Sequence, residues 1–251
     1  MSKVSVRKIV GKGLVMQANE ITQAAYSLSL PAKRILSMCL HQVGGKADHD
    51  GVFTISVADY ARFFPSDKTR VSKDVRKGVQ AFQAGLITFR LKDDPEGWES
   101  ESIPWLQKVA MKKENTPAGV YRLQLHPDLL PLIRGVKERF TKYALDDLGA
   151  FSSANQQRLY ECFCQFRKSG IWITSRDKIA AMLPDLSEGT KRNGAEMKRS
   201  LILPAIERVN SADVDLFVSF QDNSGDYVFN ILSGAKAKQA KARAKLEAVK
   251  A

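Results

Sequence analysis

The sequence is poor in the residues that hold metal ions or form disulfides. Its 251 residues include three histidines and three cysteines. No two histidines form a His-x-His pair, which excludes a metal-dependent nickase of the rolling-circle type. Cys39, Cys162 and Cys164 are an odd number without metal-type spacing, so we expect buried small hydrophobic residues in a reducing cytoplasm. Asp213-x-Asp215 is typical of a solvent-facing turn at the start of a strand rather than of a metal site.

Long hydrophobic runs and enzyme motifs are missing too. No apolar run approaches the ~18–20 residues that span a bilayer, and the first eight residues lack the apolar stretch of a signal peptide. Gly44-Gly45-Lys46 lacks the upstream glycine and the hydroxyl residue of a phosphate-binding loop. We expect a cytoplasmic protein with no catalytic role, no metal, no cofactor and no membrane partner.

Positive charge, by contrast, is abundant. Lys and Arg number 39 against 27 Asp and Glu, which gives a net charge of +12 and an isoelectric point near 9.6. Such an excess indicates a polyanionic partner: nucleic acid, an anionic membrane surface or a ribosome. With a hydrophobic fraction of 44%, the chain can form real cores and has room for two domains of ordinary size.

One pattern occurs twice, about half a chain apart. Ile55-Ser56-x-x-Asp59 and Ile173-Thr174-x-x-Asp177 each lie where a short β-rich run gives way to a helical one. A Ser or Thr followed three residues later by an acid caps a helix, because its oxygen accepts an unpaired backbone N–H. Each copy follows an amphipathic helix and precedes a basic helix and two strands. That order is the order of a winged helix.

We therefore expect an α+β fold of two tandem winged-helix domains. The expected division is a basic N-terminal arm (1–13), a first winged-helix domain (14–138), a linker (139–150), a second winged-helix domain (151–232) and a basic Ala/Lys tail (233–251). The first domain is expected to serve dimerisation and contacts with the DNA backbone or a half-site, and the second is expected to be the main DNA reader. The tail is expected to be helical only when bound to a partner.

Apolar spacing and turn residues place the elements within these domains. In the first domain they predict helices at 24–43, 58–64, 68–82 and 127–135 and strands at 52–57, 86–91, 103–111 and 120–125. In the second they predict helices at 156–166, 175–183 and 195–210, a polar loop at 185–194, and strands at 171–174, 216–220 and 227–232. Pro204, inside the last helix, predicts a kink or an altered helix end.

The last helix before the hairpin is rich in lysine and arginine in both domains. An α-helix fits the major groove of B-DNA, where Arg or Lys can bond guanine O6 and N7. Residues near the helix start and in the preceding loop usually reach the base edges. The candidates for DNA contact are Lys191, Arg192, Asn193, Lys198 and Arg199 in the second domain, and Lys68, Arg70, Lys73, Arg76 and Lys77 in the first. An ordinary solvated helix face is the alternative interpretation.

Further motifs, in one order along residues 14–232, resemble those of plasmid replication initiators that bind iterons. They are Ala24-Ala-Tyr-Ser-Leu-Ser-Leu30 with Lys33-Arg34, Val71-Ser-Lys-Asp-Val-Arg76, Pro104-Trp105, Tyr121-x-Leu-x-Leu-His-Pro127, Arg139-Phe-Thr-Lys-Tyr143, and Arg158-Leu-Tyr-Glu161 with Gln165-Phe-Arg167. The family's base-reading helix has a cluster of arginines, which Lys198-Arg199-Ser200 matches at two of three positions. The resemblance thereby adds Ser200 to the candidates for DNA contact.

The resemblance implies double-stranded DNA as the partner and a monomer–dimer switch. Monomers would bind origin repeats, and a homodimer would bind an operator inverted repeat and repress the initiator's own gene. A host replication initiator, a helicase and chaperones are implied as further partners. The alternatives are a dimeric winged-helix transcriptional repressor without a replication role and an RNA- or ribosome-associated protein. Most aromatic residues have core-type spacing, which disfavours the RNA reader.

Overall fold

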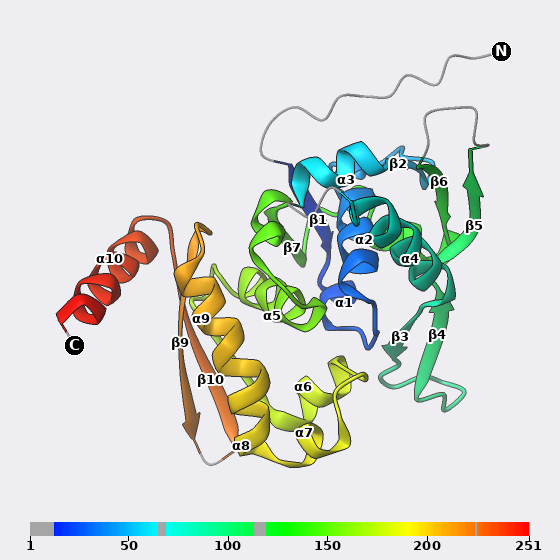
Figure 1. The fold of residues 1–251 in the computed structure, drawn as a ribbon. Helices are drawn as coiled ribbons and strands as arrows, with labels where there is room; N and C mark the ends of the chain where they lie inside the picture. The colour runs from blue at the N-terminus through cyan, green and yellow to red at the C-terminus, as the bar shows by residue number, and fades with distance from the viewer. Residues whose placement is uncertain (1–12, 65–68, 113–118, 224, 251) are drawn as a thin grey trace.

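Two three-stranded antiparallel sheets of the same strand order recur along the chain (Figure 1). The computed structural model describes residues 13–64, 69–112, 119–223 and 225–250. The first sheet has the order β2 (Val52–Ser56), β6 (Val120–Leu125), β5 (Leu106–Met111). The second has the order β8 (Ile171–Ser175), β10 (Asp226–Ser233), β9 (Leu216–Asn223). In each, the strand after the first long helix pairs with the last strand of the unit, as in a winged helix, so the predicted fold is confirmed.

The first unit packs three helices on its sheet: α2 (Leu30–Val43), α3 (Val57–Phe63) and α4 (Val71–Ala84). We predicted that the first of these helices begins at residue 24, but it begins at Leu30 and has Pro31 in its first turn. A proline ring clashes with the carbonyl four residues back, so the helix cannot extend further toward the N-terminus. Gly44, at φ 56°, ends it. A Cβ on Gly78 would lie 2.9 Å from side-chain atoms of Pro31 and Ile35, so α4 approaches α2 closely.

The second unit contains α5 (Ala154–Gln165), α6 (Arg176–Met182), α7 (Glu188–Arg192), α8 (Gly194–Met197), the π-helical turn η3 (Lys198–Ile202) and α9 (Leu203–Ser211). The segment 185–194, predicted to be a polar loop, contains the short helix α7. Ser187 caps this helix, with its Oγ accepting the backbone N–H of Thr190 at 3.1 Å. The predicted hairpin is confirmed, since β9 and β10 pair from Leu216↔Ser233 to Asn223↔Asp226.

The two predicted helix caps have different outcomes. Ser56 Oγ accepts the backbone N–H of Asp59 at 3.0 Å and donates to its carboxylate at 2.6 Å, as predicted. In the second unit Thr174 is not the cap, because β8 runs one residue further and turns Thr174 into the core. Ser175 caps α6 instead by accepting the N–H of Lys178 at 3.3 Å.

The segment 139–150, predicted to be a linker, is instead part of the folded body. It holds β7 (Phe140–Ala144) and the 3₁₀ turn η2 (Asp146–Ala150). Strand β7 pairs along its whole length with β1 (Leu14–Ala18), from Leu14↔Ala144 to Ala18↔Phe140. The short helix α1 (Asn19–Gln23) follows β1. The start of the described chain is therefore paired with the connection between the two units.

A second hairpin is inserted into the first unit between α4 and β5. It consists of β3 (Leu86–Arg90) and β4 (Ser100–Pro104). The single strand predicted at 103–111 is broken at Trp105, whose ring is buried and meets Tyr26 edge-on with 5.1 Å between centroids. The helix predicted at 127–135 is the 3₁₀ helix η1 (Pro127–Leu132), with Pro131 inside it.

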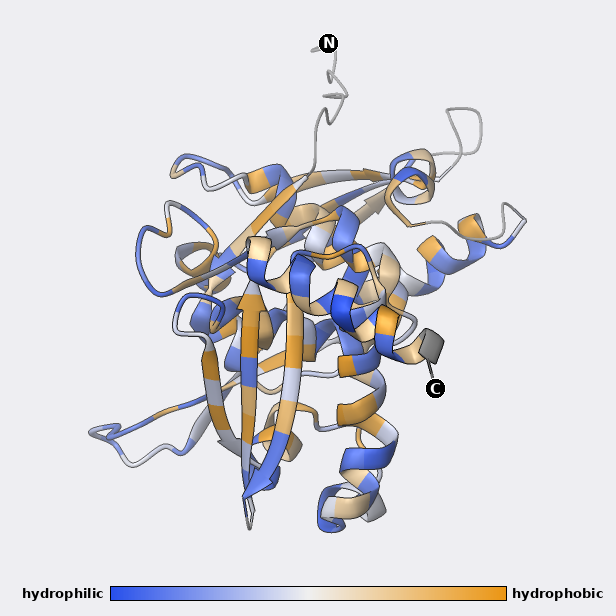
Figure 2. Cartoon of the chain, turned by 90° about the vertical axis from the view of Figure 1, so that its left-hand side faces the viewer, coloured by the Kyte–Doolittle hydropathy of each residue, from blue (hydrophilic) through white to orange (hydrophobic). Residues whose placement is uncertain are grey.

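One continuous hydrophobic core joins both units. Figure 2 shows hydrophobic and hydrophilic residues alternating along strands of the chain, and both kinds of residue on its helices. Such patterns place one face of each element on the core. Cys39, Cys162 and Cys164 are buried free thiols, as predicted, and burial raises the pKa of Cys162 and Cys164 to about 12.

The C-terminal segment is the helix α10 (Gly234–Lys250), docked on the second unit. The prediction of a tail that becomes helical only when bound was wrong. Lys241 Nζ donates to the carbonyl oxygens of Val209 at 3.0 Å, Ala212 at 2.6 Å and Val214 at 2.8 Å. The last carbonyl groups of a helix have no N–H partner within the helix, and the Lys241 ammonium supplies hydrogen-bond donors at the end of α9. The predicted basic arm, apart from Gly13, lies outside the described residues.

Candidate nucleic-acid interface

Helix α4 presents one basic face in the first unit. Its apolar face, which includes Val75, Val79 and Phe82, is buried. Lys73, Arg76 and Lys77, at the three- and four-residue spacing of one helical stripe, are exposed. Arg70 is exposed at the N-cap position. The remaining candidate of this unit, Lys68, lies outside the described residues.

In the second unit α8, η3 and α9 follow one another without a break, as one helical run with a π-helical turn inside it. The backbone N–H of Leu203 bonds the carbonyl of Lys198, five residues back. Pro204, next in the chain, has no N–H to bond Ser200. Single π turns inside α-helices are rare and are frequently found at functional sites. The predicted alteration at Pro204 is therefore present, as a π turn that contains the candidates Lys198, Arg199 and Ser200.

Lys198 is bonded to the β9–β10 hairpin. Its Nζ lies 2.6 Å from Asp222 Oδ2 near the hairpin tip, and the two side chains are 32% and 28% exposed. This hydrogen bond raises the pKa of the Lys198 ammonium and is the main cause of the lowered pKa of the Asp222 carboxyl. The pair therefore ties the basic helix to the β9–β10 hairpin, and the Asp222 carboxylate occupies the Lys198 ammonium.

Arg199 and Ser200 lie beside Glu196 on the same helical run. Arg199 Nη2 is 2.7 Å from Glu196 Oε2, yet 79% of the arginine side chain is exposed. Ser200 Oγ donates to the Glu196 carbonyl at 2.8 Å. Because an exposed pair of this kind is weak, Arg199 can exchange Glu196 for an external acceptor at little cost.

The three candidates that precede this run lie at the end of α7. Lys191 and Arg192 both pair with Glu188, at 3.0 and 3.5 Å, which lowers the pKa of that carboxyl, with the Lys191 hydrogen bond as the largest cause. Asn193 caps α8, with Oδ1 accepting the N–H groups of Ala195 at 3.0 Å and Glu196 at 3.2 Å. Asn193 thus orients the helix start in addition to any contact that it makes outside the chain.

Sequence reasoning missed two residues of this surface, Asp222 and Arg176. Arg176 donates to the carbonyl of Arg192 at 2.9 Å and pairs with Asp177 at 3.0 Å, which fixes the end of α7 against the start of α6. Both residues also line a cavity of about 310 Å³ between the hairpin tip and the starts of α6 and α8. Arg176 could have been found from the sequence, because it is a basic residue directly after the cap of α6. The sequence contains no pattern that predicts the pairing of Asp222 with Lys198, which lies 24 residues earlier.

The described residues bring no three His, Cys, Asp or Glu side chains into one metal-binding group. Within the same residues, each helix is too short or too polar to cross a bilayer.

Two winged-helix units, each with exposed cations on its last helix before the hairpin, define a class of DNA-binding protein. Residues 14–164 match the family described as "Initiator Replication protein, WH1". The chain belongs to this family of replication initiators.

The chain is also similar to individual proteins. An uncharacterised 27.6 kDa protein of Escherichia coli is 33% identical over 240 residues, which cover 90% of this chain and 97% of that protein. An uncharacterised 6.6 kDa protein of the same species is 40% identical over 53 residues, which cover 20% of this chain and 86% of that protein. The crystal structure of the Pi initiator protein in complex with iteron DNA has the same fold, with a TM-score of 0.73 at 19% identity, and covers 90% of this chain and all of the Pi chain.

Proposed function

We propose that this chain is a plasmid replication initiator that binds iteron DNA in the origin, and that it resembles in particular the initiator of the F plasmid. The proposal depends chiefly on one observation: both units expose cations on the last helix before the wing. The wing is the pair of strands β5 and β6 in the first unit and β9 and β10 in the second. It is supported by the chain's membership of the initiator family and by the shared fold of an initiator that was crystallised with iteron DNA.

In this proposal the second unit is the main reader of base sequence. Lys198, Arg199 and Ser200 enter the major groove on the π-helical turn, while Lys191, Arg192 and Asn193 meet the backbone at the end of α7. Helix α4 enters a neighbouring groove with Lys73, Arg76 and Lys77, and Arg70 and Lys68 contact the backbone beside it. Base contacts set specificity, and phosphate contacts set orientation and the salt dependence of affinity.

We further propose that the monomer binds directly repeated iterons and that a dimer represses the initiator's own gene. Strand β5 supports this as an edge strand of the first sheet, where β6 is its one neighbour among the described strands. Met111 at its end is 56% exposed. An unpaired, partly apolar edge is suited to association with a second chain. Sedimentation of the purified protein is expected to show a dimer, and the iteron complex one chain per repeat.

The experiment that tests the initiator function supplies the protein in trans to a plasmid that carries the repeats and no other origin. Replication of that plasmid supports an initiator. A protein that binds the repeats and represses its own promoter, but does not sustain the plasmid, would be the dimeric repressor without a replication role. A footprint that does not distinguish the repeats from random DNA would contradict both functions.

A further inference from the structure

The β3–β4 hairpin carries an acidic tip on a strongly basic chain. Residues 93–101, here called the acidic arm, contain five carboxylates and no cation: Asp93, Asp94, Glu96, Glu99 and Glu101. At the tip Trp98 is 64% exposed. DNA would repel this arm, so its partner is not the polyanion that the basic helices are suited to bind.

Trp98 is held outward by a defined turn. Asp94 Oδ2 accepts the backbone N–H groups of Glu96 and Trp98, each at 3.0 Å, and Gly97 has a φ of 83° that favours glycine. The indole N–H donates to Glu96 Oε2 at 3.0 Å. An ordered and exposed indole flanked by carboxylates fits an apolar groove with a cationic rim.

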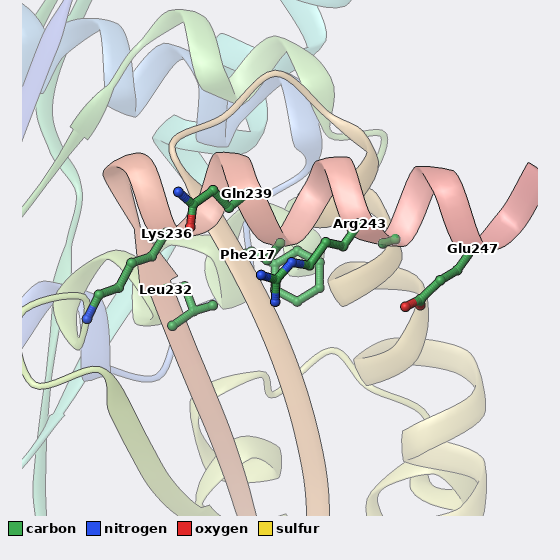
Figure 3. Close-up of a pocket in the computed structure, with 8 residues that line it drawn as sticks. Phe217, Leu232, Lys236, Gln239, Arg243 and Glu247 are labelled. Atoms are coloured by element: carbon green, nitrogen blue, oxygen red, sulfur yellow. The ribbon is translucent and has the colours of Figure 1, made fainter.

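The chain contains such a groove at α10. A cavity of about 370 Å³ lies between α10 and the strands β9 and β10 (Figure 3). Phe217, Leu232, Ala240 and Ala244 supply apolar surface, and Lys236 and Arg243 supply positive charge. Gln239 and the single acid Glu247 complete the lining. Lys236 and Arg243 are exposed and, among the described residues, form no ion pair.

The acidic arm and the α10 groove lie at opposite ends of the molecule (Figure 1). One chain therefore cannot bring them together, whereas two chains in the same orientation can. A contact between two different surfaces of identical chains is heterologous and repeats from copy to copy. Directly repeated DNA sites place neighbouring chains in one orientation, which is the arrangement that such a contact requires.

We propose that the acidic arm of one chain docks in the α10 groove of its neighbour, with Trp98 on the apolar surface and the carboxylates facing Lys236 and Arg243. The inference rests on the proposed binding to directly repeated sites. One indole and a few exposed ion pairs make a weak contact in solution, but DNA raises the effective concentration of the neighbour to about the millimolar range. The contact therefore makes binding to adjacent sites cooperative.

The test measures affinity by gel shift on duplexes with one site and with two direct repeats. The native chain is expected to bind the second repeat roughly ten-fold more tightly than an isolated one. Trp98→Ala, or Lys236→Glu with Arg243→Glu, should abolish this gain and leave affinity for one site unchanged. Adding Glu99→Lys and Glu101→Lys to the second variant should restore it. Lys137→Glu with Lys142→Glu, outside arm and groove, is the control for loss of charge.

Several results would overturn the proposal. Cooperativity that survives both disruptive variants would exclude the contact, and so would cooperativity that survives five extra base pairs between the repeats, because these turn the neighbour to the opposite face. A fall in single-site affinity for the α10 variant would show that the helix contacts DNA instead. Failure of the native chain to bind one site would contradict the proposed function and not this contact.

A second readout tests the docking without DNA. Trp98 is exposed, whereas Trp105 and Trp172, the other tryptophans, are 1% and 8% exposed, so acrylamide quenching of fluorescence reports chiefly on Trp98. On two-repeat DNA, and at roughly millimolar protein without DNA, quenching should decrease in the native chain and not in the Lys236→Glu, Arg243→Glu variant. The docking would be refuted if the native chain and the variant were quenched equally, both on two-repeat DNA and at high protein concentration without DNA.

Discussion

Lys33 Nζ lies 2.5 Å from Glu161 Oε1, and neither side chain is exposed. The lysine belongs to α2 of the first unit and the glutamate to α5 of the second. The Tyr143 hydroxyl donates to the same carboxylate oxygen at 2.6 Å. Burial alone would lower the pKa of Lys33, but the facing carboxylate offsets this and raises it. Beside this pair, Arg158 donates to the carbonyls of Ala24 at 2.7 Å and Tyr26 at 3.0 Å. Buried charge thus fixes the orientation of one unit relative to the other.

Replacing Lys33 by Met should destabilise the fold by about 3–5 kcal/mol, because it leaves the Glu161 carboxylate buried without its cation. Urea unfolding measures the change. Lys33→Met with Glu161→Gln should recover much of the loss. Arg192→Met, which breaks the exposed pair with Glu188, should not differ measurably from the native chain. The raised pKa means that the contribution of Lys33 persists at neutral pH and is lost as pH rises through that value. Unchanged stability of Lys33→Met would contradict the buried ion pair.

Lys198→Ala with Arg199→Ala should abolish discrimination between the specific site and random DNA. Each good base contact discriminates by about 1–3 kcal/mol, and phosphate contacts support both kinds of site, so affinity should fall to the non-specific level. Gel-shift competition with random duplex measures this. Lys108→Ala with Lys137→Ala removes the same charge from exposed sites outside both basic helices and should preserve discrimination. If specificity is unchanged in the first variant, base reading lies elsewhere.

Asp222→Asn should strengthen binding to random DNA. Random DNA offers Lys198 no specific base contact, so once the Asp222 carboxylate no longer holds the lysine, its ammonium can pair with a phosphate of the DNA backbone. The plot of affinity against salt should become steeper by about one phosphate contact. Asp226→Asn makes the same change of charge on the same hairpin, at an aspartate without an ion pair among the described residues, and should have a smaller effect. Equal effects would mean that net charge, rather than the pair, limits binding.

The sequence predicts those parts of the fold that local rules determine. Ser56 and Asp59 are three residues apart, and the cap between them forms as expected. The prediction of a linker at 139–150 is wrong because β7 pairs with β1, a strand more than a hundred residues away in the sequence. The docking of α10 through Lys241 depends on carbonyls of another helix end. The β1–β7 pairing and the contacts of Lys241 both join residues far apart in the sequence, so no local sequence pattern predicts them.

The same division applies to the candidate interface. The exposed face of α4 follows from its apolar spacing, so Lys73, Arg76 and Lys77 were placed correctly on the surface. That Lys198 pairs with Asp222 could not be predicted, since it depends on the register of the β9–β10 hairpin and on the path of the π turn. Whether these residues contact DNA stays a prediction.

The last prediction concerns spacing within one DNA site. The strand pair β1–β7 and the Lys33–Glu161 ion pair prevent the two units from turning independently. If both units insert a helix on one face of the duplex, their half-sites lie about one helical turn, roughly 10–10.5 base pairs, apart. Five extra base pairs between the half-sites turn one of them to the opposite face, so one unit must release its groove.

Ten extra base pairs restore the face but add ~34 Å to the distance, which a rigid body cannot span. Both insertions should therefore weaken binding severely and leave a footprint over one half-site. The control places the same insertions outside the site, where affinity should not change. Full affinity with the internal five-base-pair insertion would mean that a single unit reads DNA, and the two-reader arrangement would then be wrong.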